Sequence, residues 1–114
     1  MESTHIKVAK AVIEIEQQAL QTVSNQLDGE FAQAVELILA STGRLIVLGV
    51  GKSGHIGRKL AATLASTGTP SFFVHPAEAA HGDLGMILGN DIVLALSNSG
   101  ESEEVTAIMP VLRV

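Results

Sequence analysis

A continuous apolar run over residues 44–49, "RLIVLG", passes directly into a glycine-rich stretch, and this combination limits the possible folds most. A short apolar run without polar alternation is typical of a strand buried on both faces, as in a parallel sheet. Two further runs, over residues 71–75 and 91–97, predict two more such strands. Parallel strands joined by right-handed helical crossovers form a three-layer αβα sandwich, and this is the α/β fold that the sequence predicts.

Apolar periodicity predicts two helices ahead of the first strand. Residues 3–27 carry apolar side chains at spacings of three, four and seven, interrupted by Glu16, which predicts a long amphipathic helix. Such a helix needs an apolar partner in its own domain or in another subunit. A second helix is expected after Asp28, its candidate N-cap, and before Gly43, which is placed where a left-handed C-cap would lie.

Two more helices are expected after the first strand. One covers residues 54–67, with Ile56, Leu60 and Leu64 facing the core, and ends in the segment "TGTP". The other fills the C-terminal segment, where Pro110 should bend it or weaken its hydrogen bonding.

The chain divides into an N-terminal helical segment, residues 1–43, and the first part of an α/β domain, residues 44–114. We expect the helices of the first part to pack on that domain or on a partner subunit. Three strands make a thin parallel sheet and the last helix stops without a capping glycine, so we expect a truncated domain. Exposed apolar surface on such a fragment predicts self-association.

Composition narrows the class of protein. The 114 residues carry a net charge of −5 and no basic run, which argues against nucleic-acid binding. No apolar run approaches the length of about 18 residues that a membrane span needs, so no membrane partner is expected. The absence of cysteine excludes disulfide and thiolate chemistry, and we predict a cytoplasmic protein.

The glycine-rich stretch "GVGKSGHIG", residues 49–57, resembles three kinds of binding loop, which its spacing and context distinguish. A P-loop is excluded because its upstream glycine would fall on Ile46. A dinucleotide fingerprint is matched by the glycines, but the acid that should stand at the tip of the next strand is missing. The third is a phosphate site, in which Gly51 lets the backbone approach a ligand, Lys52 adds a cation and Ser53 caps the following helix. A plain strand-to-helix turn is the structural alternative.

A second loop strengthens the phosphate interpretation. The segment "SNSGES" follows the third strand and offers four side-chain donors: Ser97, Asn98, Ser99 and Ser102. Asn98 with Glu101 would already make a helix cap, so the additional serines exceed what a cap needs. Ligands of open α/β sheets bind beyond the carboxyl ends of the strands, where these two loops could converge.

Two further features suggest chemistry beside that site. Glu104 projects along the buried stripe of the last helix, where a raised pKa would suit a general base; a solvated glutamate is the simpler alternative. The connection over residues 75–90 is long and holds four candidate metal ligands at a spacing that matches no regular metal motif: His75, Glu78, His81 and Asp83. His81 is also placed to reach a ligand.

These loops, together with "HPAEAAHGDLGM", resemble the sugar isomerase (SIS) domain of D-arabinose 5-phosphate isomerases over nearly the whole chain. That family interconverts D-arabinose 5-phosphate and D-ribulose 5-phosphate for the synthesis of the lipopolysaccharide sugar Kdo or of capsule sugars. The resemblance implies a flavodoxin-like parallel sheet, a homotetramer, and paired CBS-type domains after the SIS domain. It implies no required cofactor; zinc would be an inhibitor, with His81 as a ligand.

The resemblance also implies roles for individual residues. Gly51 and Ser53 would line the sugar, with Lys52 in the active site. Glu104 would take part in proton transfer, and His81 corresponds to an active-site histidine. The phosphate would be held by the serine loop: Ser97, Asn98, Ser99 and Ser102.

Because the family has further strands and catalytic residues, we expect the 114 residues alone to be inactive or nearly so. The main alternative is a non-catalytic sugar-phosphate-binding regulatory module, since SIS domains also serve in transcription regulators. A sensor needs the serine loop but no base, so Lys52 with Glu104 favours the enzyme. Nucleotide binding is the second alternative, which the missing acid disfavours.

Overall fold

The computed structural model describes residues 3–80 and 83–98 of the chain. The chain forms two compact units, Met1–Leu37 and Ile38–Val114, which we call the N-terminal unit and the sheet unit. The C-terminal helix expected from the sequence, with Pro110, lies outside the described residues.

Two helices follow the N-terminal capping signals of the sequence. Helix α1 spans Thr4–Gln26, and the Ser3 hydroxyl at its N-cap accepts a hydrogen bond of 3.2 Å from the His5 N–H. Helix α2 spans Gly29–Ala40, and the Asp28 carboxylate accepts a bond of 3.0 Å from the Glu30 N–H. Both helices and the Asp28 cap agree with the predictions. No residue of α1 is buried, so its apolar side chains remain exposed in this chain.

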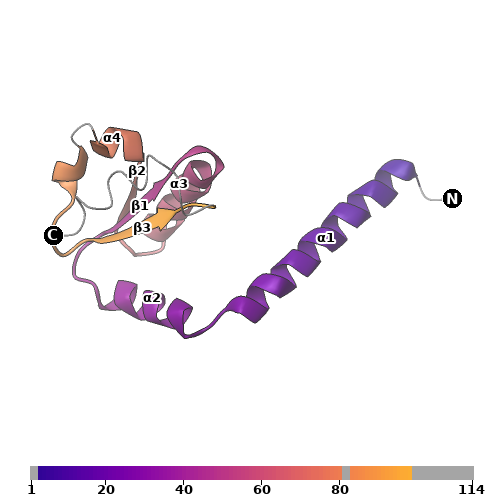
Figure 1. Ribbon diagram of the computed structural model, residues 1–114, viewed down its shortest axis with the longest axis horizontal. Helices are drawn as coiled ribbons and strands as arrows, with labels where there is room; N and C mark the ends of the chain where they lie inside the picture. The colour runs from indigo at the N-terminus through magenta and orange to yellow at the C-terminus, as the bar shows by residue number, and fades with distance from the viewer. Residues whose placement is uncertain (1–2, 81–82, 99–114) are drawn as a thin grey trace. The chain divides into compact units, whose positions relative to one another are not determined.

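The sheet unit is built on three parallel strands, as the apolar runs predict. They are β1 (Leu45–Gly49), β2 (Ser71–Val74) and β3 (Ile92–Leu96), in the order β2-β1-β3 (Figure 1). Every residue of the central strand β1 is buried, because it has a neighbour on each edge and side chains on both faces.

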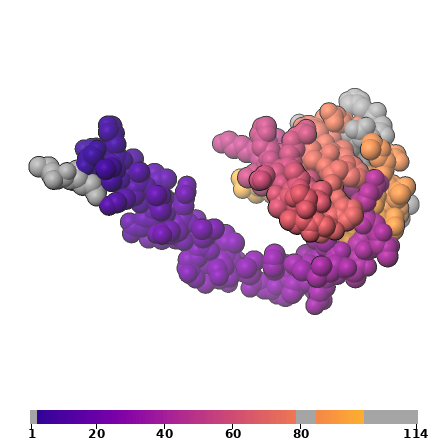
Figure 2. Space-filling model, turned by 180° about the vertical axis from the view of Figure 1, so that it is seen from behind, coloured from indigo at the N-terminus to yellow at the C-terminus, as the bar shows by residue number. Residues whose placement is uncertain are grey.

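Helix α3 (Gly51–Ser66) connects β1 to β2 and covers one face of the sheet. The core on this face is built around Leu45, Val47 and Ala61. Figure 2 shows α3, magenta to pink, at the surface of the unit seen from behind. The helix ends as predicted by "TGTP", with Gly68 at a φ of 106°, where a residue with a side chain would be strained.

The connection from β2 to β3 contributes to the opposite face of the sheet. It contains the short helix α4 (Pro76–Ala80) and the 3₁₀ turn η1 (Asp83–Met86), and Ile87 after η1 packs against a core of Ile46, Leu48 and Val74. The sheet therefore has apolar cores on both faces, which is the three-layer arrangement that the sequence predicts.

The expected inward face of α3 is wrong in part. Ile56 is 66% exposed, and the buried residues of the helix are Gly54, Gly57 and Ala61. A Cβ added to Gly57 would lie 3.0 Å from the Phe73 ring, so residues without bulk bring the helix close to the sheet. Apolar periodicity overlooks such a face, because glycine and alanine carry little of the hydrophobic signal.

The expected left-handed C-cap at Gly43 is also wrong. Among the described residues, positive φ angles occur only at Gly51 and Gly68. A Cβ at Gly43 would instead run into the carbonyl group of Asn90. Gly43 is thus required for a close approach between the segment before β1 and the turn before β3.

Within the described ranges, no helix combines the length and apolar character needed to cross a membrane.

Candidate functional site

The carboxyl ends of β1 and β3 form the edge of the sheet where a ligand site is expected. Gly49, the last residue of β1, pairs with Leu96, the last residue of β3. The chains leaving these two strands therefore begin at the same edge, side by side. In an open α/β fold, the carboxyl ends of neighbouring parallel strands are the usual place for a ligand, and β1 and β3 are such neighbours in the order β2-β1-β3.

The glycine-rich stretch turns directly from β1 into α3. Val50 occupies the N-cap position with extended backbone, and Gly51 has a φ of 59°, which favours glycine. The first intrahelical bond runs from the Gly54 N–H to the Val50 carbonyl over 3.2 Å. The preceding amides, those of Gly51, Lys52 and Ser53, have no acceptor within the helix and are available to an anion.

This geometry corrects two expectations. The helix begins at Gly51 rather than near Gly54, so Lys52 and Ser53 belong to its first turn. Ser53 is therefore not the cap, because the N-cap position is held by Val50, whose side chain has no polar atom. Because this cap leaves the first N–H groups of α3 without a side-chain acceptor, the start of the helix suits the binding of a negatively charged group.

Two glycines allow the first turn of α3 to press against the end of β1. A Cβ on Gly49 would lie 2.9 Å from the Ser53 carbonyl oxygen, and one on Gly54 would lie 2.8 Å from the Gly49 carbonyl oxygen. Each obstacle is backbone and cannot rotate away. Two glycines of the triplet that resembles a dinucleotide fingerprint, Gly49 and Gly54, therefore allow close packing of the helix on the strand.

A pocket of about 290 Å³ lies where the two loops meet. Its lining comes from the first turns of α3, from the end of β3 and from the two residues after it: Ser53, Ile56, Leu96, Ser97 and Asn98. The structure therefore brings together three of the predicted site residues, Ser53, Ser97 and Asn98. The exposed side of Ile56, which apolar periodicity assigned to the core, forms part of this pocket.

The remaining predicted site residues fall into two groups. Gly51 and Lys52 are exposed in the first turn of α3, next to the pocket in sequence but not among its lining residues. The other four lie outside the described residues: His81, Ser99, Ser102 and Glu104. Their roles stay predictions.

Of the predicted metal ligands in the β2–β3 connection, His75 has a defined hydrogen bond in the structure. The His75 Nδ1 atom accepts a hydrogen bond of 3.1 Å from the Ala77 N–H, so this histidine caps the start of α4. Across the described part of the chain, no three His, Cys, Asp or Glu side chains gather closely enough to hold a metal ion.

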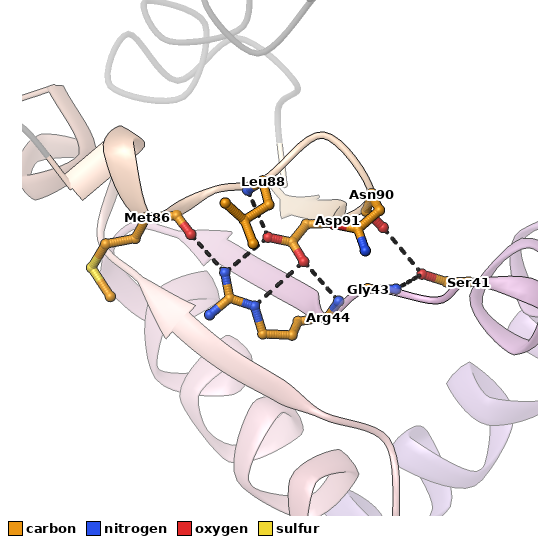
Figure 3. Close-up of polar contacts among 7 residues, drawn as sticks. All are labelled: Ser41, Gly43, Arg44, Met86, Leu88, Asn90 and Asp91. Atoms are coloured by element: carbon orange, nitrogen blue, oxygen red, sulfur yellow. Dashed lines mark hydrogen bonds and ion pairs between the residues drawn. The ribbon is translucent and has the colours of Figure 1, made fainter.

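A polar cluster that the sequence analysis missed lies at the opposite edge of the sheet, before β1 and β3. The Asp91 carboxylate accepts hydrogen bonds from the Arg44 backbone N–H at 2.8 Å, from Arg44 Nη2 at 3.0 Å and from Arg44 Nε at 3.4 Å (Figure 3). It also accepts a bond of 2.8 Å from the Leu88 N–H. Arg44 Nη2 donates further to the Met86 carbonyl at 2.6 Å. We call Arg44, Asp91, Met86 and Leu88 the Arg44–Asp91 anchor.

The carboxylate at the centre of this anchor stays ionised far into the acid range. The side-chain hydrogen bonds from Arg44, followed by the backbone N–H groups of Leu88 and Arg44, hold the pKa of Asp91 well below its usual range. Burial opposes this shift, since the Asp91 side chain is only 1% exposed, but the four donors outweigh it. No local sequence pattern predicts this ion pair, because Arg44 and Asp91 are 47 positions apart in the sequence.

Comparison with known proteins identifies the class. Residues 38–114 match the SIS domain family, and the chain belongs to it. Curated relatives include the arabinose 5-phosphate isomerase KdsD of Pseudomonas aeruginosa, 54% identical over 108 residues, and that of Escherichia coli, 55% identical over 107 residues. These alignments cover 95% and 94% of this chain but only 33% of each relative, so the chain spans about a third of their length.

A solved structure supports the same fold. An Escherichia coli protein in complex with arabinose 5-phosphate superposes with a TM-score of 0.90 at 47% sequence identity. The match covers 99% of this chain and 61% of the other. The predicted α/β fold with an N-terminal helix and the predicted resemblance to the isomerase family are both confirmed.

Proposed function

We propose that this chain carries the sugar-phosphate site of an aldose–ketose isomerase that interconverts D-arabinose 5-phosphate and D-ribulose 5-phosphate. The pocket at the carboxyl ends of β1 and β3 carries the proposal, because it joins Ser53, Ser97 and Asn98 from two loops. The choice of substrate is supported by the names of the curated relatives and by the arabinose 5-phosphate complex of the similar Escherichia coli protein.

The phosphate group is assigned to the serine loop and the start of α3. The amides of Gly51, Lys52 and Ser53 lack helical acceptors, and the dipole of a 16-residue helix favours an anion at this end. Ser97 and Asn98 add side-chain donors directly after β3, and Ser99 and Ser102 would follow them in the same loop. Charge-assisted hydrogen bonds of this kind are about twice as strong as neutral ones.

The carbonyl end of the sugar is assigned to Lys52 and Glu104. A base removes the proton from carbon 2 of the aldose while the oxygen on carbon 1 gains one, which produces the cis-enediol. Return of a proton to carbon 1 and loss of the proton from the oxygen on carbon 2 gives the ketose. Glu104 would carry the proton between carbons, Lys52 would stabilise the developing oxyanion, and His81 would contact the sugar. No electron leaves the substrate, so no redox cofactor is required.

The activity is proposed for a chain of the relatives' full length, because these 114 residues correspond to about a third of it. Two measurements separate binding from turnover. The 114-residue chain is titrated with arabinose 5-phosphate by calorimetry. A hybrid, in which residues 1–114 replace the matching part of the Pseudomonas aeruginosa relative, is assayed for ribulose 5-phosphate.

We expect the 114-residue chain to bind the sugar phosphate without appreciable turnover and the hybrid to turn it over. In the hybrid, Glu104→Gln should lower kcat by about 10²–10⁴ while leaving the affinity nearly unchanged. A hybrid with full turnover after this substitution would remove Glu104 from the mechanism. The proposed function is refuted if the 114-residue chain does not bind arabinose 5-phosphate and the hybrid neither binds nor converts it.

A non-catalytic sugar-phosphate sensor is the competing function, because the same phosphate cradle would serve it. Tight binding of arabinose 5-phosphate by a hybrid without turnover would favour the sensor. Binding of NAD instead of the sugar phosphate would favour the nucleotide alternative, in spite of the missing acid.

Self-association is part of the proposal. An apolar stripe along α1 and its C-cap residue supports it, since the stripe is exposed at five positions spaced by three, four or seven residues: Ile6, Ile13, Leu20, Val23 and Leu27. We propose a homo-oligomer, a tetramer at full length, and sizing chromatography coupled to light scattering measures its mass. A monomer at micromolar concentration would contradict this part. Inhibition by zinc through His81 is tested by adding the metal to the hybrid.

A further inference from the structure

The pocket at the carboxyl ends of β1 and β3 has an apolar part that phosphate binding does not use. Among the described residues that line it, Ile56 and Leu96 have side chains without a polar atom. A phosphate group is held by hydrogen-bond donors and positive charge, so these two side chains contribute nothing to its binding. They need an explanation beyond the phosphate site.

The direction of the chain places these apolar residues behind the polar ones. Helix α3 connects the carboxyl end of β1 to the amino end of β2, and the two strands are parallel, so the helix runs back along the sheet. Ile56 follows Ser53 by three residues and lies about 4.5 Å further back along the helix axis. Leu96 is the last residue of β3, and Ser97 and Asn98 come after it, beyond the edge of the sheet. The polar groups of the pocket are therefore at its rim, and the apolar groups lie toward the body of the sheet.

The packing of α3 explains why Ile56 is found in the pocket. A Cβ added to Gly57 would lie 3.0 Å from the Phe73 ring of β2, so the glycine side of the helix contacts that strand. Strand β3 lies on the other side of β1, and Ile56 lines the pocket together with Leu96 of β3 (Figure 1). The close contact of Gly57 with β2 thus leaves the neighbouring Ile56 beside the end of β3.

Most of the apolar surface of Ile56 is open to a ligand, since this residue is 66% exposed. A single exposed isoleucine is ordinary on a protein surface. Here, however, it lies in a pocket next to Leu96, which is half-buried and packs against the core of Leu45, Val47 and Ala61. A ligand that covers Ile56 and Leu96 gains free energy roughly in proportion to the apolar surface removed from water.

We propose that Ile56 and Leu96 form an apolar floor that contacts the carbon chain of a bound phosphate ester, so that the pocket prefers such esters to free phosphate. Ile56 is the specificity-determining residue, because it is the more exposed of the two. Arabinose 5-phosphate as the natural ester rests on the proposed function, and the methylene group that carries its phosphate is the part expected against the floor. The preference for a carbon chain does not depend on that function.

The first experiment needs no substitution. The isotope-labelled 114-residue chain is titrated with inorganic phosphate and with methyl, ethyl and propyl phosphate, and binding is followed by the amide chemical shifts of α3. We expect the affinity to rise along this series, by up to about fourfold for each methylene that the floor buries. An affinity that stays level or falls along the series would overturn the apolar floor, as would binding of none of these ligands.

The second experiment repeats the series with variants. Ile56→Ala should abolish the gain from the carbon chain and keep the affinity for inorganic phosphate within about twofold of wild type, and Ile56→Val should lie between. Leu88→Ala is the matched control, because Leu88 is 58% exposed but precedes β3 at the other edge of the sheet and does not line this pocket. It should change neither affinity. A gain that persists in Ile56→Ala, or an equal loss for inorganic phosphate and the esters, would contradict the role of Ile56.

Arabinose 5-phosphate separates the floor from the proposed function. By calorimetry, Ile56→Ala should weaken its binding several-fold, while Leu88→Ala should not. If the wild-type chain binds the alkyl phosphates as expected but not arabinose 5-phosphate, the proposed function fails and the floor stands. If wild type and Ile56→Ala bind arabinose 5-phosphate equally well, the floor fails and the proposed function stands.

Discussion

The two edges of the sheet use polar groups in opposite ways. At the amino ends of β1 and β3, a buried carboxylate accepts four hydrogen bonds, and the adjoining cavity of about 10 Å³ has room for roughly one water molecule. At the carboxyl ends, the first amides of α3 have no helical acceptor, and Ser53 of the same helical turn lines a pocket of about 290 Å³. Polar groups that satisfy one another stabilise the fold, whereas groups without internal acceptors are available to a ligand.

Substitutions at the amino-end edge should therefore change stability, and those at the carboxyl-end edge should change binding.

Asp91→Asn should cause the largest loss of stability, because an amide cannot accept all the donors that face Asp91. The effect depends on pH. The pKa of Asp91 is lowered in the folded chain, so its stabilisation is complete above the ordinary aspartate pKa of about 3.9 and is lost as pH falls through the folded value. Urea unfolding at several pH values should therefore show a difference between wild type and variant that is largest near neutrality and shrinks in acid. A difference that stays constant down to about pH 3 would mean that the ionised carboxylate is not responsible.

Gly43→Ala should cost about 1–3 kcal/mol of unfolding free energy, because the new Cβ meets the Asn90 backbone and one of the two segments must move. Gly89→Ala is the control: an added Cβ there meets nothing within 4 Å, and its φ is not positive. We expect this control to stay within about 0.5 kcal/mol of wild type. Denaturant unfolding measures both, and similar losses in the two variants would show that the close approach at Gly43 is unimportant.

Lys52→Met should weaken binding of arabinose 5-phosphate about tenfold, which corresponds to about 1.4 kcal/mol, and leave the melting temperature nearly unchanged. The side chain is exposed in the first turn of α3, so little packing is lost. Lys59→Met, also exposed and two turns further along the same helix, is the matched control. Equal binding losses in both variants would indicate a general effect of charge and no specific contact by Lys52.

Ile56→Ala should have the smallest effect on stability, within about 0.5 kcal/mol, because its side chain is 66% exposed. Leu64→Ala, on the side of α3 that contacts the core, should cost clearly more. Thermal unfolding of the two variants tests the corrected orientation of the helix. Ligand binding to Ile56→Ala tests whether this pocket residue touches the sugar phosphate.

The sequence alone determined the elements whose signals are local. The apolar runs that end at Gly49 and Leu96 predict parallel strands, Asp28 and Gly68 mark a helix start and a helix end, and all of these are observed. The predicted burial holds for β1, whereas β3 is half-buried and Ala95 is exposed. That residues of two loops line one pocket was also predictable, because glycines and hydroxyl residues follow the strands within a few positions. The resemblance to the isomerase family rests on these same loops and is confirmed.

Only the tertiary structure decided which side of α3 faces the sheet and what Gly43 and Arg44 contact. Gly54 and Gly57 are buried because helix and strand approach each other there, a fact that no hydrophobic periodicity encodes. Asp91 meets Arg44 across 47 positions because β3 pairs with β1 in one particular register. The physical reason is the range of the interactions: caps, turns and strand propensity act between near neighbours, whereas clashes and ion pairs exist only once distant segments are placed side by side.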